Sequence, residues 1–186
     1  IPLSHASFTK RVSAMIKSNK GKAISFYCNG VTCLKSYEAT KKANGIGCKH
    51  CYVYDSGIPN WAKEYPQKTI LLGAKVVNPK KQIIPKSEFK KKCLSFNDFK
   101  AKAKAANTRL IDARDHIQKS GKLPGLGKTT NLPFDKLIPN FIQKKREQNK
   151  TLLIFDQVGK QVRWLEYYLV KYGYKDYYFL NGGATK

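Results

Sequence analysis

The sequence predicts an α/β protein of two units, each with a mostly parallel β-sheet flanked by helices. Short apolar or aromatic runs alternate with segments of helical periodicity, which is typical of parallel sheets with helical crossovers. The order strand, loop, helix, glycine, aromatic strand, glycine also occurs twice, over residues 23–57 and again over 151–183. We therefore expect two related units within the 186 residues.

The first unit is expected to begin with a helix, because apolar side chains recur at helical spacing at Phe8, Val12, Met15 and Ile16. Strands are expected where apolar and aromatic residues follow one another without a break. In chain order, the expected elements are a helix ending at residue 18, a strand at 23–27, a helix at 36–43, a strand at 51–54 and a short helix around residue 61.

Residues 74–85 are expected to form a linker, because they contain two prolines and three lysines and show no periodic face. We place the domain boundary there, which gives domains at 1–78 and 79–186. The second unit's expected elements are helices at 87–92 and 95–106, a strand at 109–112, a loop at 121–127, a helix at 135–148, a strand at 151–155, a helix at 162–172 and a strand at 177–180.

The chemistry is expected to centre on Cys28, at the end of the first predicted strand. Asn29 and Gly30 follow it, and both tolerate positive φ, so the backbone turns sharply there. The loop N–H groups and the N-terminus of the next helix would converge on an anion, and a thiol at such a position is acidified toward thiolate. The alternative is a buried cysteine that only packs, but the glycine-containing loop favours the reactive interpretation.

This stretch resembles the active-site loop of the rhodanese, or sulfurtransferase, family. The resemblance rests on FYCNG at 26–30, on Cys33 and Lys35-Ser36, and on the turn GIPNW at 57–61. In that family the cysteine after the strand carries the transferred sulfur as a persulfide, and Cys28 matches it. The resemblance implies no metal, no cofactor and a substrate-binding loop formed by Asn29, Gly30, Val31, Thr32, Cys33, Leu34, Lys35 and Ser36.

The second half resembles another unit of the same family. Its Asp112-Ala-Arg114 resembles the family's Asp-x-Arg, and 123–125 resembles an Ile-Pro-Gly that usually follows a histidine, here replaced by Lys122. Asp156 stands where Cys28 stands in the first half, and a carboxylate cannot carry sulfane sulfur. We therefore expect tandem rhodanese-like domains, the first lacking the part that would lie upstream of Ile1, and the second catalytically silent.

The leading hypothesis is sulfur transfer from a small anionic donor, thiosulfate or polysulfide, to a thiol, cyanide or a protein cysteine, through a Cys28 persulfide. Cys33 is either a resolving thiol that closes a disulfide with Cys28 or a loop residue that fills space. One alternative is a phosphatase or arsenate-reductase-type enzyme, because the Cys28 loop is two residues longer than the Asp156 loop. Lys35 weakens this alternative, since those enzymes use an arginine. The other alternative to sulfur transfer is a non-catalytic sulfur-binding or interaction protein.

Composition limits the partners. The chain carries 36 Lys and Arg against 12 Asp and Glu, a formal net charge of +24. These cations are spread along the chain without an RNA-binding aromatic signature, so we favour a solvated surface that concentrates anionic donors over a nucleic-acid partner. No apolar run has the length of a membrane span. By analogy with related proteins, the bacterial periplasm is favoured over the cytoplasm as the location. The start at Ile1-Pro2 suggests that the chain is a processed or trimmed piece. The oligomeric state is open.

The five cysteines leave at least one unpaired within a monomer. Cys48 and Cys51 have CxxC spacing. The leading interpretation makes Cys51 an inward strand residue and Cys48 a loop residue, with no bond between them. A local disulfide is the second interpretation and a metal site the third, because a zinc site would also need Cys28 and Cys33.

Overall fold

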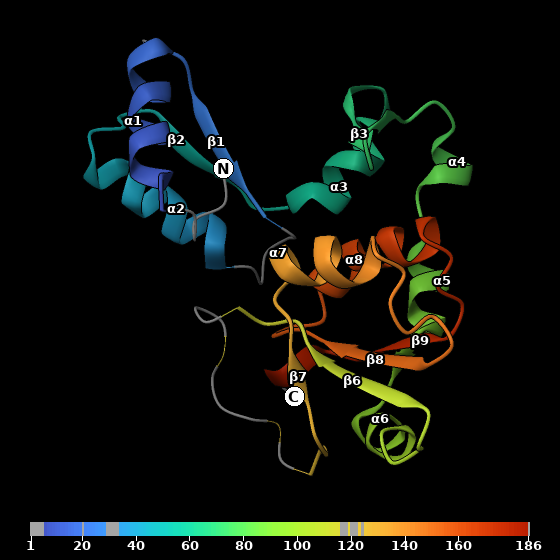
Figure 1. The fold of residues 1–186 in the computed structure, drawn as a ribbon. Helices are drawn as coiled ribbons and strands as arrows, with labels where there is room; N and C mark the ends of the chain where they lie inside the picture. Colours follow the sequence, from blue (N-terminus) through green and yellow to red (C-terminus); the bar gives the residue numbers. More distant parts are fainter. Residues whose placement is uncertain are drawn as a thin grey trace. The chain divides into compact units, whose positions relative to one another are not determined.

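The computed structural model describes residues 6–19, 21–28, 34–115, 119, 123 and 125–185. The chain folds as two units, Ile1–Pro66 and Gln67–Lys186, and each is described here by itself (Figure 1). We call them unit 1 and unit 2. The sequence places the boundary between two related domains after residue 78. That boundary stays a prediction.

Unit 1 contains a pair of parallel strands with helices beside it. Its elements are α1 (Phe8–Ser18), β1 (Ile24–Tyr27), α2 (Leu34–Gly45), β2 (Cys51–Tyr54) and α3 (Gly57–Glu64), followed by the 3₁₀ turn η1 (Pro66–Lys68) at the boundary. Ile24 lies opposite Cys51 and Tyr27 opposite Tyr54. Parallel neighbours need a crossover, and α2 supplies it.

The core of unit 1 is small. Phe8 and Val12 of α1 are fully buried against Ala39 and Ala43 of α2, and the buried Cys48 joins them. A core of this size supplies limited hydrophobic stabilisation, so a covalent link matters more here than it would in a large domain.

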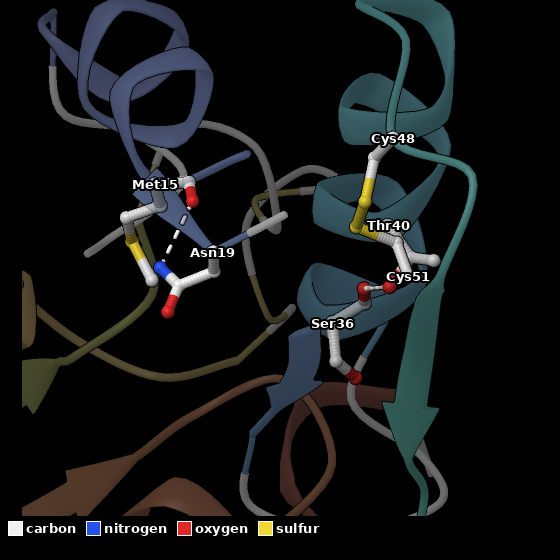
Figure 2. Close-up of a disulfide and its surroundings, with 6 residues drawn as sticks. All are labelled: Met15, Asn19, Ser36, Thr40, Cys48 and Cys51. Atoms are coloured by element: carbon white, nitrogen blue, oxygen red, sulfur yellow. Dashed lines mark hydrogen bonds between the residues drawn. A yellow bond between two sulfur atoms is a disulfide. The ribbon is translucent and has the colours of Figure 1, made fainter. Parts of the chain in front are cut away.

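Cys48 and Cys51 form that link, a disulfide with a Cα–Cα distance of 5.8 Å (Figure 2). It joins the turn after α2 to the first residue of β2. The expectation that these two cysteines are not bonded to each other is therefore wrong, and the second interpretation, a local disulfide, is what the structure shows. The reason is local: the backbone bends between them, and His50 C=O accepts the N–H of Ile24, which holds the turn against the start of β1.

Removing this bond is expected to weaken unit 1. Loss of a four-residue closed loop corresponds to about 2 kcal/mol of unfolded-state entropy, so Cys48→Ala combined with Cys51→Ala should lower the free energy of unfolding by about that amount. Denaturant unfolding followed by Trp61 fluorescence, in a Trp164→Phe background, measures it. A double variant as stable as the parent, or a shift confined to unit 2, would contradict this role.

Unit 2 is organised around a five-stranded sheet with the order β5-β9-β8-β6-β7, in which every neighbouring pair is parallel. The strands are β5 (Cys93–Leu94), β6 (Thr108–Asp112), β7 (Thr130–Asn131), β8 (Thr151–Phe155) and β9 (Tyr177–Leu180). The helical segments are α4 (Pro79–Gln82), α5 (Lys86–Lys91), α6 (Phe96–Lys102), α7 (Phe134–Leu137), the π-helix η2 (Ile138–Ile142), α8 (Gln161–Lys171) and the 3₁₀ turn η3 (Gly183–Thr185). A short antiparallel pair, β3 (Ile70–Leu71) and β4 (Ala74–Lys75), precedes them.

Both faces of the central strands are covered, which explains why β8 is an unbroken apolar run. Leu152 and Ile154 face a core that includes Leu165 of α8. Leu153 and Phe155 face the opposite core, where Phe99 of α6 is fully buried. Figure 1 accordingly shows α8 on one side of the sheet and α6 on the other.

The sheet order places a topological switch point between β6 and β8. The chain leaves β6 toward β7 on one side and leaves β8 toward β9 on the other, so the two connections diverge. Asp112 and Phe155 are paired at the carboxyl ends of these strands. Crevices at such ends are where open parallel sheets bind ligands.

Several element boundaries differ from expectation. The helix expected at 135–148 ends at Ile142, and Lys145 and Glu147 then take positive φ values of 50° and 52°, which no helix accommodates. The helix expected at 95–106 ends at Lys102. The expected linker at 74–85 contains β4 and α4, because the Asn78 side chain caps α4 by accepting the Lys81 N–H.

Candidate functional site

Cys28 directly follows β1 and is half-buried. Its C=O accepts the N–H of Ile58 at 2.9 Å, which ties the end of β1 to the first turn of α3. The cysteine is disulfide-bonded, and its partner lies outside the described residues. The thiol that the sequence singles out is therefore oxidised in this structure.

The structure describes part of the expected binding loop. Asn29, Gly30, Val31, Thr32 and Cys33 lie outside the described residues. The remainder opens α2, which begins at Leu34 rather than at Ser36.

The first turn of α2 combines an exposed Leu34, a half-buried Lys35 and a buried Ser36, and it contains no acidic side chain. The positive end of this twelve-residue helix and the Lys35 ammonium both favour an anion in the preceding loop.

Sequence analysis did not identify Asp55 and Tyr37. Asp55 directly follows β2, so it lies at the same edge of the parallel pair as Cys28. The Tyr37 hydroxyl of α2 donates a hydrogen bond to the Asp55 carboxylate, which raises the pKa of Tyr37. The bond connects α2 to the end of β2. Asp55 is recognisable in the sequence only as the first residue after a strand.

In unit 2 the position after the corresponding strand holds Asp156, which is only 1% exposed. Its carboxylate accepts four backbone N–H groups: from Val158 at 3.1 Å, Gln161 at 2.5 Å, Val162 at 3.0 Å, and Gly159. Burial raises the pKa of Asp156, and these four hydrogen bonds act in the opposite direction. As expected from the sequence, the carboxylate faces the loop N–H groups. The chain thus fills this anion-binding loop with its own side chain.

Asp156→Ala is expected to lower the free energy of unfolding of unit 2 by about 1–3 kcal/mol, because it leaves buried N–H groups without an acceptor. Added formate, which carries the lost carboxylate, should recover part of the loss in melting temperature. Asp156→Asn keeps one amide oxygen as an acceptor. Its melting temperature is expected to lie between those of the parent chain and of Asp156→Ala. An unchanged melting temperature in Asp156→Ala would contradict this role.

Asp112 and Arg114 fix the neighbouring strand end. The Arg114 guanidinium donates to both Asp112 carboxylate oxygens at 2.9 Å, and both side chains are buried. Arg114 Nη1 also reaches the Gln157 Oε1 at 3.4 Å, and its guanidinium lies 5.3 Å from the Phe155 ring centroid. In this fork geometry the polar atoms of the buried pair have hydrogen-bond partners in each other. The contacts of Arg114 tie the end of β6 to the loop after β8.

Cys93, at the start of β5, is the free cysteine among the described residues. Its half-buried thiol donates to the Phe89 C=O at 3.4 Å. Burial, with Glu166 and Asp156 adding to it, raises the pKa of Cys93 to about 11. The thiolate fraction at pH 8 is then about one thousandth, so Cys93 is a poor candidate nucleophile.

We expect Cys93 to stay unmodified under iodoacetamide at pH 8, under conditions that alkylate the other reduced cysteines. Its modification should rise as the pH approaches 11, since only the thiolate reacts. Peptide mass spectrometry after timed alkylation measures both rates. Rapid modification of Cys93 at pH 8 would show that its thiol is more acidic than its buried environment implies.

Within the described part of the chain, no three His, Cys, Asp or Glu side chains are grouped closely enough to hold a metal ion. No helix there has both the length and the apolar character needed to span a membrane.

Residues 95–186 match the family model described as Rhodanese-like domain. No curated protein matches the chain. Among solved structures, the chain is similar to a protein of unknown function, described as a possible tyrosine phosphatase, from Rhodopseudomonas palustris CGA009. The two are 19% identical, with a TM-score of 0.41, over 50% of this chain and 75% of that one.

The protein SSP1007 from Staphylococcus saprophyticus subsp. saprophyticus is 22% identical, with a TM-score of 0.40, over 50% of this chain and 90% of its own. YnjE is 12% identical, with a TM-score of 0.40, over 94% of this chain and 49% of its own, so the match spans about half of YnjE.

Unit 2 thus has a fully parallel, doubly covered sheet with a loop of converging N–H groups after β8. Residues 95–186 form a rhodanese-like domain. The family covers sulfurtransferases and also phosphatase-like members.

Proposed function

We propose that this protein is a sulfurtransferase that carries sulfane sulfur on Cys28. The observation that carries the proposal is the position of Cys28, after a strand and before the N-terminus of a helix whose first turn contains Lys35 and no acid. Backbone N–H groups and a helix N-terminus at this position stabilise both a thiolate and an anionic donor.

The proposed cycle begins with the reduced Cys28 thiolate. It attacks the outer sulfur of thiosulfate, the sulfur–sulfur bond of the donor breaks, and sulfite leaves with the electron pair. Cys28 then holds a persulfide. A thiolate or cyanide attacks the terminal sulfur and regenerates the Cys28 thiolate. Lys35 and the α2 N-terminus stabilise the negative charge of the donor and of the persulfide.

We propose Cys33 as the thiol that resolves the persulfide on Cys28. Attack of the Cys33 thiolate on the inner sulfur of the persulfide would release hydrogen sulfide and leave a Cys28–Cys33 disulfide. An external thiol would reopen it by exchange. The oxidised form is then what remains when no acceptor is present.

Unit 1 is proposed to be a second rhodanese-like domain. Support comes from the repeat of strand, crossover helix and parallel strand: β1, α2 and β2 in unit 1 follow the order of β8, α8 and β9 in unit 2. Unit 2 is proposed to be catalytically silent, because the Asp156 carboxylate occupies its loop. Disulfides persist in oxidising compartments, which supports the bacterial periplasm as the proposed location.

The test uses the full chain after reduction and removal of the reductant. With thiosulfate and cyanide, we expect thiocyanate release that saturates with thiosulfate. In a parallel reaction with p-nitrophenyl phosphate we expect no hydrolysis above background, because Lys35 offers a point charge rather than the bidentate grip of an arginine. Phosphate-ester hydrolysis without thiocyanate release would replace the proposal with the phosphatase alternative. If the chain shows neither activity, the result would favour the binding-protein alternative.

A further inference from the structure

A pocket of about 290 Å³ opens in unit 2 at the carboxyl ends of β6 and β8, where the strand connections diverge. Asp156 is not among its lining residues, so the pocket is distinct from the loop that the Asp156 carboxylate fills. The volume equals that of about ten water molecules, enough for a small organic molecule.

The charges around the pocket do not balance. Asp112 lines it, but both of its carboxylate oxygens are engaged by Arg114, which also lines it, so this pair is neutral. Lys119 and Lys128 are the other charged side chains among the described residues that line it. Both are exposed, and neither forms an ion pair with a described residue. Two ammonium groups therefore remain to attract an anion.

One wall of the pocket is apolar. Phe155, Leu123 and Leu126 line it, and all three belong to the core around Phe99 of α6. Phe155 is fully buried, while the two leucines are half-buried. An apolar wall of this kind gains little from a bare inorganic ion, which prefers water, but it gains from a ligand with an apolar body.

We infer that this pocket binds a small organic anion, with its oxyanion facing Lys119 and Lys128 and its apolar body against Leu126 and Phe155. Three independent features support the inference: two uncompensated ammonium groups, an apolar wall and a place at the switch point of the sheet. It concerns unit 2 alone and does not depend on sulfur transfer at Cys28.

The test is calorimetric titration of the full chain with benzenesulfonate at fixed ionic strength. We expect one site per chain. Lys119→Gln combined with Lys128→Gln should weaken binding by about tenfold or more, because two charge-assisted contacts are lost. The matched control is Lys136→Gln combined with Lys144→Gln, which removes the same charge from exposed lysines that do not line the pocket. This control should bind like the parent chain.

Three results would overturn the inference. Equal weakening in the control pair would show that the high net charge of the chain, and not this pocket, attracts the anion. Inorganic sulfate binding as tightly as benzenesulfonate would remove the role of the apolar wall. Benzyl alcohol, a neutral aromatic of similar size, binding as tightly would remove the role of the lysines. All four substituted lysines are exposed, and unchanged melting temperatures would show that both variants are folded.

Discussion

Replacing Cys28 by serine is expected to abolish thiocyanate formation from thiosulfate and cyanide. A serine hydroxyl is far less acidic than a thiol and cannot hold a persulfide, so no residual route through this position remains. The measurement is steady-state thiocyanate release by the reduced full chain. Because Cys28 is half-buried at the end of β1, the substitution should leave the fold of unit 1 intact, which far-UV circular dichroism checks.

The matched control is Cys93→Ser, at the free cysteine of unit 2 whose pKa is raised to about 11. It should retain the parent rate. Cys33→Ser should leave the first turnover intact, since the proposed role of Cys33 comes after persulfide formation. Equal loss in Cys33→Ser and Cys28→Ser would show that the two cysteines act as a unit, and loss in Cys93→Ser alone would move the nucleophile to unit 2.

Gly183→Ala is expected to disrupt the Asp156 loop and lower the free energy of unfolding of unit 2 by about 3 kcal/mol or more. Gly183 has φ +70°, a region that alanine rarely adopts. An added Cβ would also stand 2.6 Å from the backbone nitrogens of Val158 and Gly159. These atoms are backbone, so they cannot rotate away as a flexible side chain would.

Gly127→Ala is the control for this effect, because a Cβ there meets no atom within 4 Å and Gly127 lies in the same unit. Its melting temperature should stay close to that of the parent chain, whereas that of Gly183→Ala should fall by many degrees in a thermal scan. A Gly183→Ala protein that melts like Gly127→Ala would mean that the close approach of the two backbone segments is not needed for the loop.

The long strands were predictable because burial on both faces imposes a readable pattern. β8 is a run of five apolar or β-branched residues, and β1 and β9 are aromatic-rich runs followed by turn signals. The two-residue strands β5 and β7 are too short to show any period. They exist because the longer β9 and β6 beside them offer unpaired edges, which is a tertiary effect.

Parts of the site were also readable. The position of Asp156 after an apolar strand and before a helix predicted that its carboxylate faces loop N–H groups, because the strand–loop–helix order alone brings them together. The Cys48–Cys51 bond was not preferred, since CxxC spacing is equally compatible with a free pair or with metal ligands. The pocket beside Phe155 could not be predicted, because it combines segments that meet only after the sheet has formed.

The central claim is that Cys28 carries sulfane sulfur. The most direct measurement is the intact mass of the reduced Cys33→Ser chain, which cannot resolve the persulfide into a disulfide, after incubation with thiosulfate in the absence of an acceptor, followed by peptide mapping with the thiols trapped. We predict a gain of one sulfur atom per chain, located on the peptide that contains Cys28 and removed by cyanide. A chain that gains no sulfur, or gains it on Cys93 while Cys28 stays unmodified, would contradict the account.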